Sequence, residues 1–242
     1  MFIHRQFRAL GSRDLPKEVR LRGKVYARAE TFKHTSISAV GVYRSDDGQK
    51  LVLKCYRRAP FFGMPAAWVG WMMAHYEAAV LRCVEGVRGV PHLRGLWGRT
   101  AILRDYVPGQ ALTRESRVDD GFFDDLFRLL GELHERGIAY VDLEKASNII
   151  LGDDGRPHLI DFQVAFYMPR RFLGETCVFR WVRRTLQDAD LYHARKHFRR
   201  LQNHKLTKSQ VERLRVRPWL VRMANVLHAP LKELRRYVLG RS

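Results

Sequence analysis

Three side chains that could handle a metal ion and a proton flank one predicted hairpin: Asp142, Asn148 and Asp161. Apolar, strand-forming runs stand on either side of the turn-forming stretch 152–157. Antiparallel pairing of the two strands is expected to bring the three polar groups together. Carboxylate and amide oxygens are ligands that Mg²⁺ accepts, and a further carboxylate can act as a general base. The stretch predicts a Mg²⁺ site beside a proton acceptor, and the alternative is a plain hairpin with solvated turn acids.

The stretch 140–166 resembles the catalytic and metal-binding segments of the protein-kinase-like superfamily, with Asp-Phe-Gln at 161–163 where Asp-Phe-Gly usually stands. The resemblance implies that Asp142 orients or deprotonates an acceptor hydroxyl. It also implies that Asn148 and Asp161 hold Mg²⁺ on the phosphates of ATP.

Two departures from the kinase pattern are visible in this stretch. Tyr and Val at 140–141 replace the usual His-Arg, and five residues rather than four separate Asp142 from Asn148. Lys145 lies in the lengthened loop and is a candidate to neutralise charge on the transferring phosphoryl group.

An upstream lysine and glutamate are the next candidates. Lys54 lies among apolar neighbours in the strand predicted for 51–56, where a lysine is more often a surface residue than a phosphate ligand. Glu77 lies in the middle of the predicted helix 65–84, and Glu85 competes with it near the helix end. The resemblance implies that Lys54 aligns the α- and β-phosphates and that Glu77 fixes the lysine through an ion pair.

The expected nucleotide contacts complete the site. The turn 33–38 stands where kinases carry a Gly-rich loop, but it contains no glycine. Its backbone N–H groups and the hydroxyls of Ser36 and Ser38 can still cradle phosphate, although an ordinary polar turn is the alternative. The resemblance implies that the adenine base meets the backbone of the hinge from about Arg104 to Val107, which includes Tyr106.

Hydrophobic periodicity predicts the elements that must position these residues. Residues 1–22 are basic and weakly patterned and are expected to form an arm or a short helix. The aromatic and Met residues of the helix 65–84 are expected to be core rather than a membrane-insertion patch. Asp190 either buttresses the loop at 140–148 from below or is a helix N-terminal acid. Strands are predicted at 24–32, 39–43, 51–56, 92–98 and 100–106, and helices at 65–84, 119–136, 179–186 and 189–201.

Composition indicates a globular chain with polyanionic partners. The 242 residues carry a formal net charge of +19 and 46% hydrophobic residues. Residues 166–242 hold 19 Lys and Arg against five Asp and Glu, so most of this charge is C-terminal. Three scattered cysteines favour a reduced, cytoplasmic compartment. The basic tail 211–241, with Trp219 among its arginines, predicts docking on the anionic cytoplasmic face of a membrane, unless these residues complete the core.

The expected fold is α+β, a two-lobed protein-kinase-like fold with a β-rich N-lobe at 1–107 and a minimal helical C-lobe at 108–242. The chain looks most like the bacterial lipopolysaccharide-core (Kdo/heptose) kinases and their RIO-like relatives. This resemblance implies ATP- and Mg²⁺-dependent phosphoryl transfer to a hydroxyl of an anionic or membrane-associated saccharide. A RIO-like serine/threonine protein kinase and a catalytically silent kinase-fold binding protein are the alternatives, and nucleic acid is the weaker partner candidate.

Overall fold

The computed structural model describes residues 8–60, 64–167 and 176–202. The chain divides into two compact units. Residues 1–110 and 158–164 form the first unit, and residues 111–157 and 165–242 form the second. The short segment 158–164, which carries Asp161, therefore belongs with the N-terminal sheet rather than with residues 111–157, which precede it in sequence.

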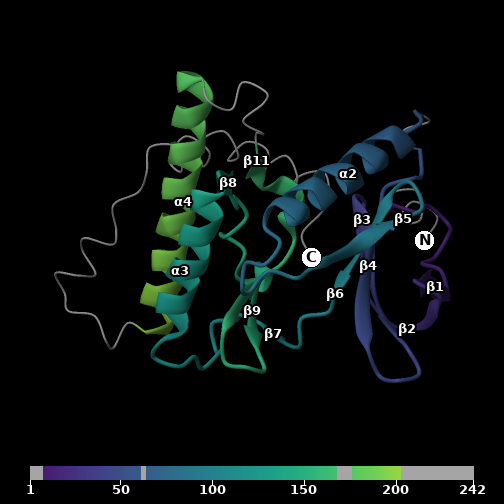
Figure 1. Cartoon of the computed structure of the whole chain (residues 1–242), viewed down its shortest axis with the longest axis horizontal. Coiled ribbons are helices and arrows are strands. Elements are labelled where there is room, and N and C mark those ends of the chain that lie inside the picture. Colours follow the sequence, from purple (N-terminus) through teal and green to yellow (C-terminus); the bar gives the residue numbers. More distant parts are fainter. Residues whose placement is uncertain (1–7, 61–63, 168–175, 203–242) are drawn as a thin grey trace, which may run out of the picture. The chain divides into compact units, whose positions relative to one another are not determined.

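The first unit is built on an antiparallel sheet of six strands in the order β1-β2-β3-β4-β6-β5, with the helix α2 inserted between β4 and β5 (Figure 1). The predicted β-rich N-terminal part, followed by a mainly helical remainder, is present. The elements are β1 (Glu18–Leu21), β2 (Lys24–His34), β3 (Ser38–Arg44), β4 (Lys50–Tyr56), α2 (Ala67–Cys83), β5 (Leu93–Trp97) and β6 (Ala101–Asp105).

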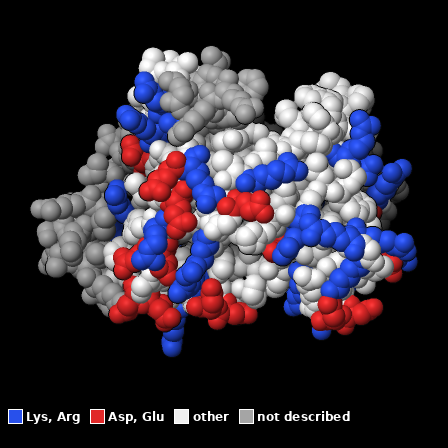
Figure 2. Space-filling view, in the orientation of Figure 1, with Lys and Arg blue, Asp and Glu red and all other residues white. Residues whose placement is uncertain are grey.

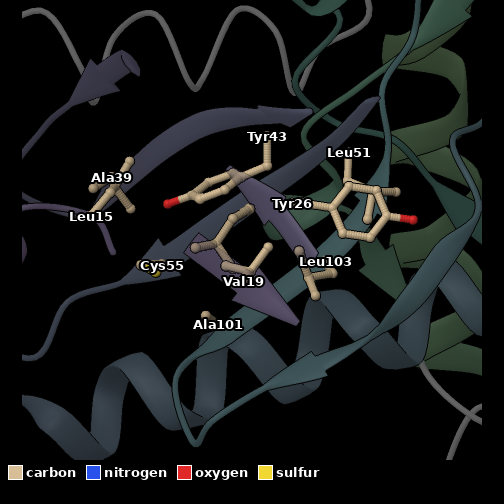
Figure 3. Packing of buried hydrophobic residues seen from close by; sticks show 10 residues of the cluster. Leu15, Val19, Tyr26, Ala39, Tyr43, Leu51, Cys55, Ala101 and Leu103 are labelled. Atoms are coloured by element: carbon tan, nitrogen blue, oxygen red, sulfur yellow. The ribbon is translucent and has the colours of Figure 1, made fainter. Parts of the chain in front are cut away.

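Both faces of the central strand β4 are buried, which explains its continuous apolar run. Alternate residues of a strand point to opposite faces, so Leu51, Leu53 and Cys55 share one face and Lys54 and Tyr56 share the other. The Leu51 face belongs to a core cluster that Figure 3 shows from close by. The residues of this cluster are Leu15, Val19, Tyr26, Ala39, Tyr43, Leu51, Leu53, Cys55, Ala101 and Leu103.

The N-terminal segment supplies the cover for that face. Leu15 and Val19 are part of the core cluster, and β1 pairs with β2 in a regular antiparallel register. Tyr43 donates its hydroxyl to the Pro16 carbonyl oxygen at 2.7 Å. The expectation of an arm or short helix is therefore wrong for residues 18–21, which form a strand. The apolar residues of this segment cover a face of the sheet that would otherwise be exposed to solvent, and the sequence pattern did not reveal that this face lacked a cover.

Helix α2 packs on the sheet through its small residues. Its buried positions include Gly70, Ala74 and Ala78, while Trp68 and Trp71 are exposed. A Cβ atom at Gly70 would lie 2.0 Å from the Arg57 carbonyl oxygen, so only glycine permits this close approach. The expectation that the aromatic and Met residues of this helix are core is wrong, since the small residues occupy the contact face instead.

The second unit is mainly helical. The helix α3 (Phe122–Glu135) buries the predicted apolar stripe from Phe122 to Leu133, and Gly137 at φ +79° ends it as expected. The two helical stretches predicted after residue 178 form one helix, α4 (Cys177–Leu201). The remaining short elements are β7 (Gly109–Ala111), β8 (Ile138–Ala139), η1 (Ala146–Asn148), β9 (Ile149–Gly152), β10 (Pro157–Leu159), η2 (Phe162–Val164) and β11 (Phe166–Tyr167).

The predicted hairpin is present, because β9 lies between β10 and β7 in a three-stranded sheet. Strand β8 pairs with β11 in the second unit. Within the described ranges, the helices are all too short or too polar to cross a membrane. The tail 211–241, for which membrane docking is predicted, lies outside the described residues.

Candidate active site

Lys54 lies at the centre of a buried cluster of charges in the first unit. Its Nζ atom is 2.9 Å from Glu77 Oε2, 3.1 Å from Glu77 Oε1 and 2.6 Å from Asp161 Oδ1. The side chains of Lys54 and Glu77 are 4% and 1% exposed, whereas that of Asp161 is 29% exposed. Three residues that lie far apart in the sequence are thus brought together, and Glu77 rather than Glu85 is the glutamate that pairs with Lys54.

The secondary structure explains how Lys54 and Glu77 meet. Lys54 points to the face of β4 that α2 covers, and Glu77 is on the buried face of α2. Tyr56 lies two residues after Lys54 and therefore on the same face. Its hydroxyl donates to Glu77 Oε2, and its ring centroid is 5.1 Å from Lys54 Nζ. Burial and the neighbouring Glu77 carboxylate raise the pKa of Tyr56 well above its usual value.

Sequence reasoning missed Tyr56, although its spacing from Lys54 was a usable signal. A side chain at i+2 on a strand shares the surroundings of the residue at i. The tyrosine O–H gives the buried Glu77 carboxylate a second donor, which buried charges require.

Asp161 is held in place through its own backbone. It adopts φ +68°, a left-handed conformation that aspartate tolerates better than most residues. The next residue, Phe162, is fully buried, and its N–H donates to Glu77 Oε1 at 3.1 Å. Glu77 therefore positions both the ammonium group of Lys54 and the backbone that follows Asp161.

The cluster carries one ammonium group against two carboxylates. The partly exposed carboxylate is that of Asp161, which gives a hard oxygen ligand at the edge of the cluster.

Asp142 belongs to a separate cluster in the second unit. Its Oδ2 atom accepts a hydrogen bond from Asn148 Nδ2 at 2.9 Å and one from Lys145 Nζ at 2.7 Å. Asn148 Nδ2 is also 3.2 Å from the Asp142 carbonyl oxygen. Because both bonds use the amide nitrogen, the carbonyl oxygen of Asn148 is the atom that could ligate a metal. The lengthened loop closes through the turn η1, so its extra residue does not prevent Asn148 from reaching Asp142.

The backbone just before Asp142 is fixed by Asp190 of α4. Asp190 is fully buried and accepts hydrogen bonds from the Tyr140 N–H at 2.7 Å and the Val141 N–H at 2.8 Å. His134 Nε2 lies 3.2 Å from the same carboxylate. Val141 has φ +71°, which is strained for a β-branched residue. Of the two hypotheses for Asp190, the structure supports the buttress.

Further residues of α4 hold the same loop. His197 Nε2 donates to the Leu143 carbonyl oxygen at 2.8 Å, and Lys196 Nζ is 3.5 Å from Glu144 Oε1. Burial lowers the pKa of His197 and of His193. These two histidines are four residues apart and therefore lie on the same face of α4. In the part of the chain that the structure describes, no group of three or more His, Cys, Asp or Glu could hold a metal ion.

The turn between β2 and β3 is stabilised by hydrogen bonds among its own residues. The N–H groups of Ile37 and Ser38 both donate to Thr35 Oγ1, at 3.3 and 3.1 Å. Ser38 is buried and Ser36 is exposed. The role of Ser36 and Ser38 in binding phosphate stays a prediction, and the geometry leaves the exposed Ser36 hydroxyl as the better candidate.

The predicted hinge residues differ in their surroundings. Arg104 of β6 is buried on the face of the sheet that carries Lys54, and its Nε has no hydrogen-bond partner among the described residues. Tyr106 is half-buried, with Lys50 Nζ 5.0 Å from its ring centroid. A buried donor without a partner costs about 1–3 kcal/mol, so Arg104 is suited to meet an acceptor atom of a ligand.

The predicted site residues thus form two groups. Lys54, Glu77 and Asp161 meet in the first unit, and Asp142 and Asn148 meet in the second. The predicted metal ligands Asn148 and Asp161 fall in different units. Their joint action on one metal ion stays a prediction.

Comparison with solved structures shows the fold. The Rio2 kinase–ADP/Mg²⁺–phosphoaspartate complex from Chaetomium thermophilum matches with a TM-score of 0.53 and 16% identity over 75% of this chain. The BubR1 kinase domain matches with a TM-score of 0.52 and 16% identity over 78% of this chain. The chain spans 58% of the Rio2 structure and 66% of the BubR1 structure. No protein-family model and no curated protein matches the sequence. At this identity the likeness concerns architecture alone, and the chain has a protein-kinase-like α+β fold.

Proposed function

We propose that the protein is an ATP- and Mg²⁺-dependent phosphotransferase that moves the γ-phosphoryl group to an acceptor hydroxyl. The observation that carries this proposal is the buried Lys54, held between Glu77 and Asp161 on a kinase-like sheet. The ammonium group of an ordinary surface lysine is exposed to water. Here three elements of the first unit converge on that group, which suits it to align phosphate oxygens.

The residues present fit the nucleotide and its metal. Asp161 and Asn148 offer hard oxygen atoms of the kind that Mg²⁺ prefers. Lys54 would bind the α- and β-phosphates, and the buried Arg104 Nε offers a further donor. Mg-ATP, when bound, supplies the phosphoryl group that is transferred.

Asp142 would accept the proton of the acceptor hydroxyl. Its carboxylate is held by Asn148 and Lys145, and its loop is fixed by Asp190, so its orientation is set before an acceptor binds. Lys145, whose side chain is exposed, would balance negative charge near the reacting groups.

The acceptor that we propose is a hydroxyl of a lipopolysaccharide-type or other membrane-associated saccharide. The support comes from the resemblance of the motifs to the lipopolysaccharide-core kinases and from the net charge of +19, which favours anionic partners. A RIO-like protein kinase is the second candidate, since the Rio2 complex with ADP and Mg²⁺ is among the structures that share this fold.

The test is Mg²⁺-dependent ATP turnover with lipid-linked saccharides, ribonucleoprotein particles and protein substrates. Asp142→Asn should reduce transfer about 10²–10⁴-fold, because it removes a general base, while ATP still protects the protein against thermal unfolding. Asp161→Asn should lose that ATP-dependent protection together with turnover.

Asp153→Asn is the matched control, because it removes the same charge from the exposed turn between β9 and β10. It should behave like the wild type in both measurements. Normal turnover in Asp142→Asn and normal protection by ATP in Asp161→Asn would overturn the assignment. Protection by ATP without turnover on any acceptor class would indicate a silent nucleotide-binding protein.

A further inference from the structure

The exposed side of α2 is far more apolar than the side that packs on the sheet. Trp68, Trp71 and Met72 are 65%, 47% and 49% exposed, and Met64 just before the helix is 64% exposed. Trp68 and Met72 are four residues apart and therefore neighbours on one helix face. Trp71 stacks on His75 with ring centroids 4.5 Å apart. We call Met64, Trp68, Trp71 and Met72 the α2 patch.

The contact face of α2 explains why these large side chains remain outside. Gly70, Ala74 and Ala78 are fully or nearly fully buried, and the approach at Gly70 leaves no room for even one carbon atom. A helix that docks through small residues has to place its large residues elsewhere. Most soluble helices place polar residues there, whereas this helix places two tryptophans and a methionine.

The charges around the α2 patch are basic. Residues 64–76 contain no Asp, Glu, Lys or Arg, and the single carboxylate of α2, Glu77, is buried. Arg58 is exposed and adjoins Arg57, whose carbonyl oxygen lies beneath Gly70. Arg58 N–H donates to the Ala9 carbonyl oxygen, which places the exposed Arg8 nearby.

Figure 2 shows the same pattern on the surface. The region over the N-terminal end of α2, at the upper right, is free of charged groups and is bordered by Lys and Arg.

We propose that the α2 patch docks on the interfacial region of an anionic phospholipid bilayer. Tryptophan and methionine with arginines near the start of the helix, and no carboxylate among residues 64–76, match the chemistry of a bilayer interface, where ring and chain enter the headgroup boundary. The arginines add attraction to anionic headgroups. This surface does not depend on the proposed phosphotransfer, and it is separate from the tail 211–241.

Charge argues against the rival occupants. A second copy would bring the same basic border to this face, and each chain carries a formal net charge of +19, so like charges disfavour that pairing. The segment 203–242 is also strongly basic and would meet the same repulsion.

The experiment measures binding of the full chain to vesicles of phosphatidylglycerol and phosphatidylcholine, with chain-brominated lipids that quench inserted tryptophan. Wild-type protein should bind anionic vesicles, and brominated lipid should quench its fluorescence. Trp68→Ser/Trp71→Ser should weaken binding at least about tenfold and remove most of the quenching, because the inserted rings are lost. Trp219→Ser, in the basic tail, should keep most of the quenching, which assigns the quenched rings to the α2 patch even if the double variant is unstable.

Trp181→Ser is the matched control, since Trp181 is 53% exposed on α4 in the second unit. It should keep wild-type binding and quenching. Met72→Glu, which places a carboxylate in the patch, should reproduce the loss at low salt.

Equal binding and quenching of wild type and Trp68→Ser/Trp71→Ser would overturn the proposal, as would failure of the wild type to bind anionic vesicles. Light scattering that shows a dimer of the wild type and a monomer of the double variant would assign the patch to self-association instead.

Discussion

The two clusters of the candidate site are organised by opposite means. In the first unit the charged side chains hold each other: Lys54, Glu77 and Asp161 are in direct contact, and Tyr56 adds a hydrogen bond. In the second unit the structure fixes the backbone, through Asp190, and leaves the side chain of Asp142 with the exposed Lys145 and with Asn148.

This difference corresponds to two kinds of chemical work. Groups that bind the charge of a phosphate act most strongly where water is excluded, and such groups must be paired when no ligand is present. A general base must be held in one orientation toward its acceptor, so its loop is held still. The comparison predicts that substitutions in the first cluster lower stability because they leave a buried charge unpaired. Substitutions around the second cluster are expected to disorder the loop that carries Asp142.

The largest effect is expected from Lys54→Met. It leaves Glu77 buried without its ammonium partner, and removal of one partner of a buried ion pair costs about 3–5 kcal/mol. Chemical denaturation measures this free energy of unfolding. The double variant Lys54→Met/Glu77→Gln should recover a large part of the loss, because the unpaired charge is gone. If the two substitutions add independently, the side chains of the first cluster do not hold each other.

A smaller but more local effect is expected from Asp190→Ala. The Tyr140 and Val141 N–H groups lose their acceptor, and buried donors without partners cost about 1–3 kcal/mol each. Hydrogen exchange should show faster exchange of these two amides, while the amide of Phe162, bound to Glu77 in the first unit, stays protected. Asp190→Asn keeps one acceptor oxygen and should retain protection of one amide. Unchanged exchange at both sites would mean that another group holds the loop.

The smallest effect concerns pH. The pKa values of His193 and His197 are lowered from 6.5 by burial, so the unfolded chain takes up protons at a higher pH than the folded chain. The contribution to stability is complete above pH 6.5 and is lost as the pH falls from there towards the folded pKa values. The slope reaches about 1 kcal/mol per pH unit for each histidine.

Thermal unfolding between pH 5 and pH 8 measures this dependence. Replacement of both residues by Gln should flatten the curve below pH 6.5. A curve that is equally steep without the two histidines would place the titrating groups elsewhere.

Much of this protein could be predicted from short-range pattern. Strand-forming runs separated by turn residues predicted β2 to β6 and the β9–β10 hairpin, and the apolar stripe of α3 predicted its buried face. Glu77 could be selected because it lies in the middle of a helix among apolar neighbours, whereas Lys54 and Asp161 were selected through the resemblance to kinase motifs. In each case neighbours along the chain carry the information, as a period of two or 3.6 residues or as a short motif.

Other features were decided only by the tertiary structure, because they depend on contacts between residues that are distant in sequence. The segment 8–21 became part of the core because one face of the sheet needed a cover, and local pattern does not show which face is open. Asp190 became a buttress because α4 lies against β8 and α3, so its carboxylate meets the backbone N–H groups of Tyr140 and Val141. The outward tryptophans of α2 follow from the close contact at Gly70, which admits only small residues. Apolar periodicity shows that a helix has an apolar face. The distance between the helix and the sheet determines whether its large or its small residues are buried.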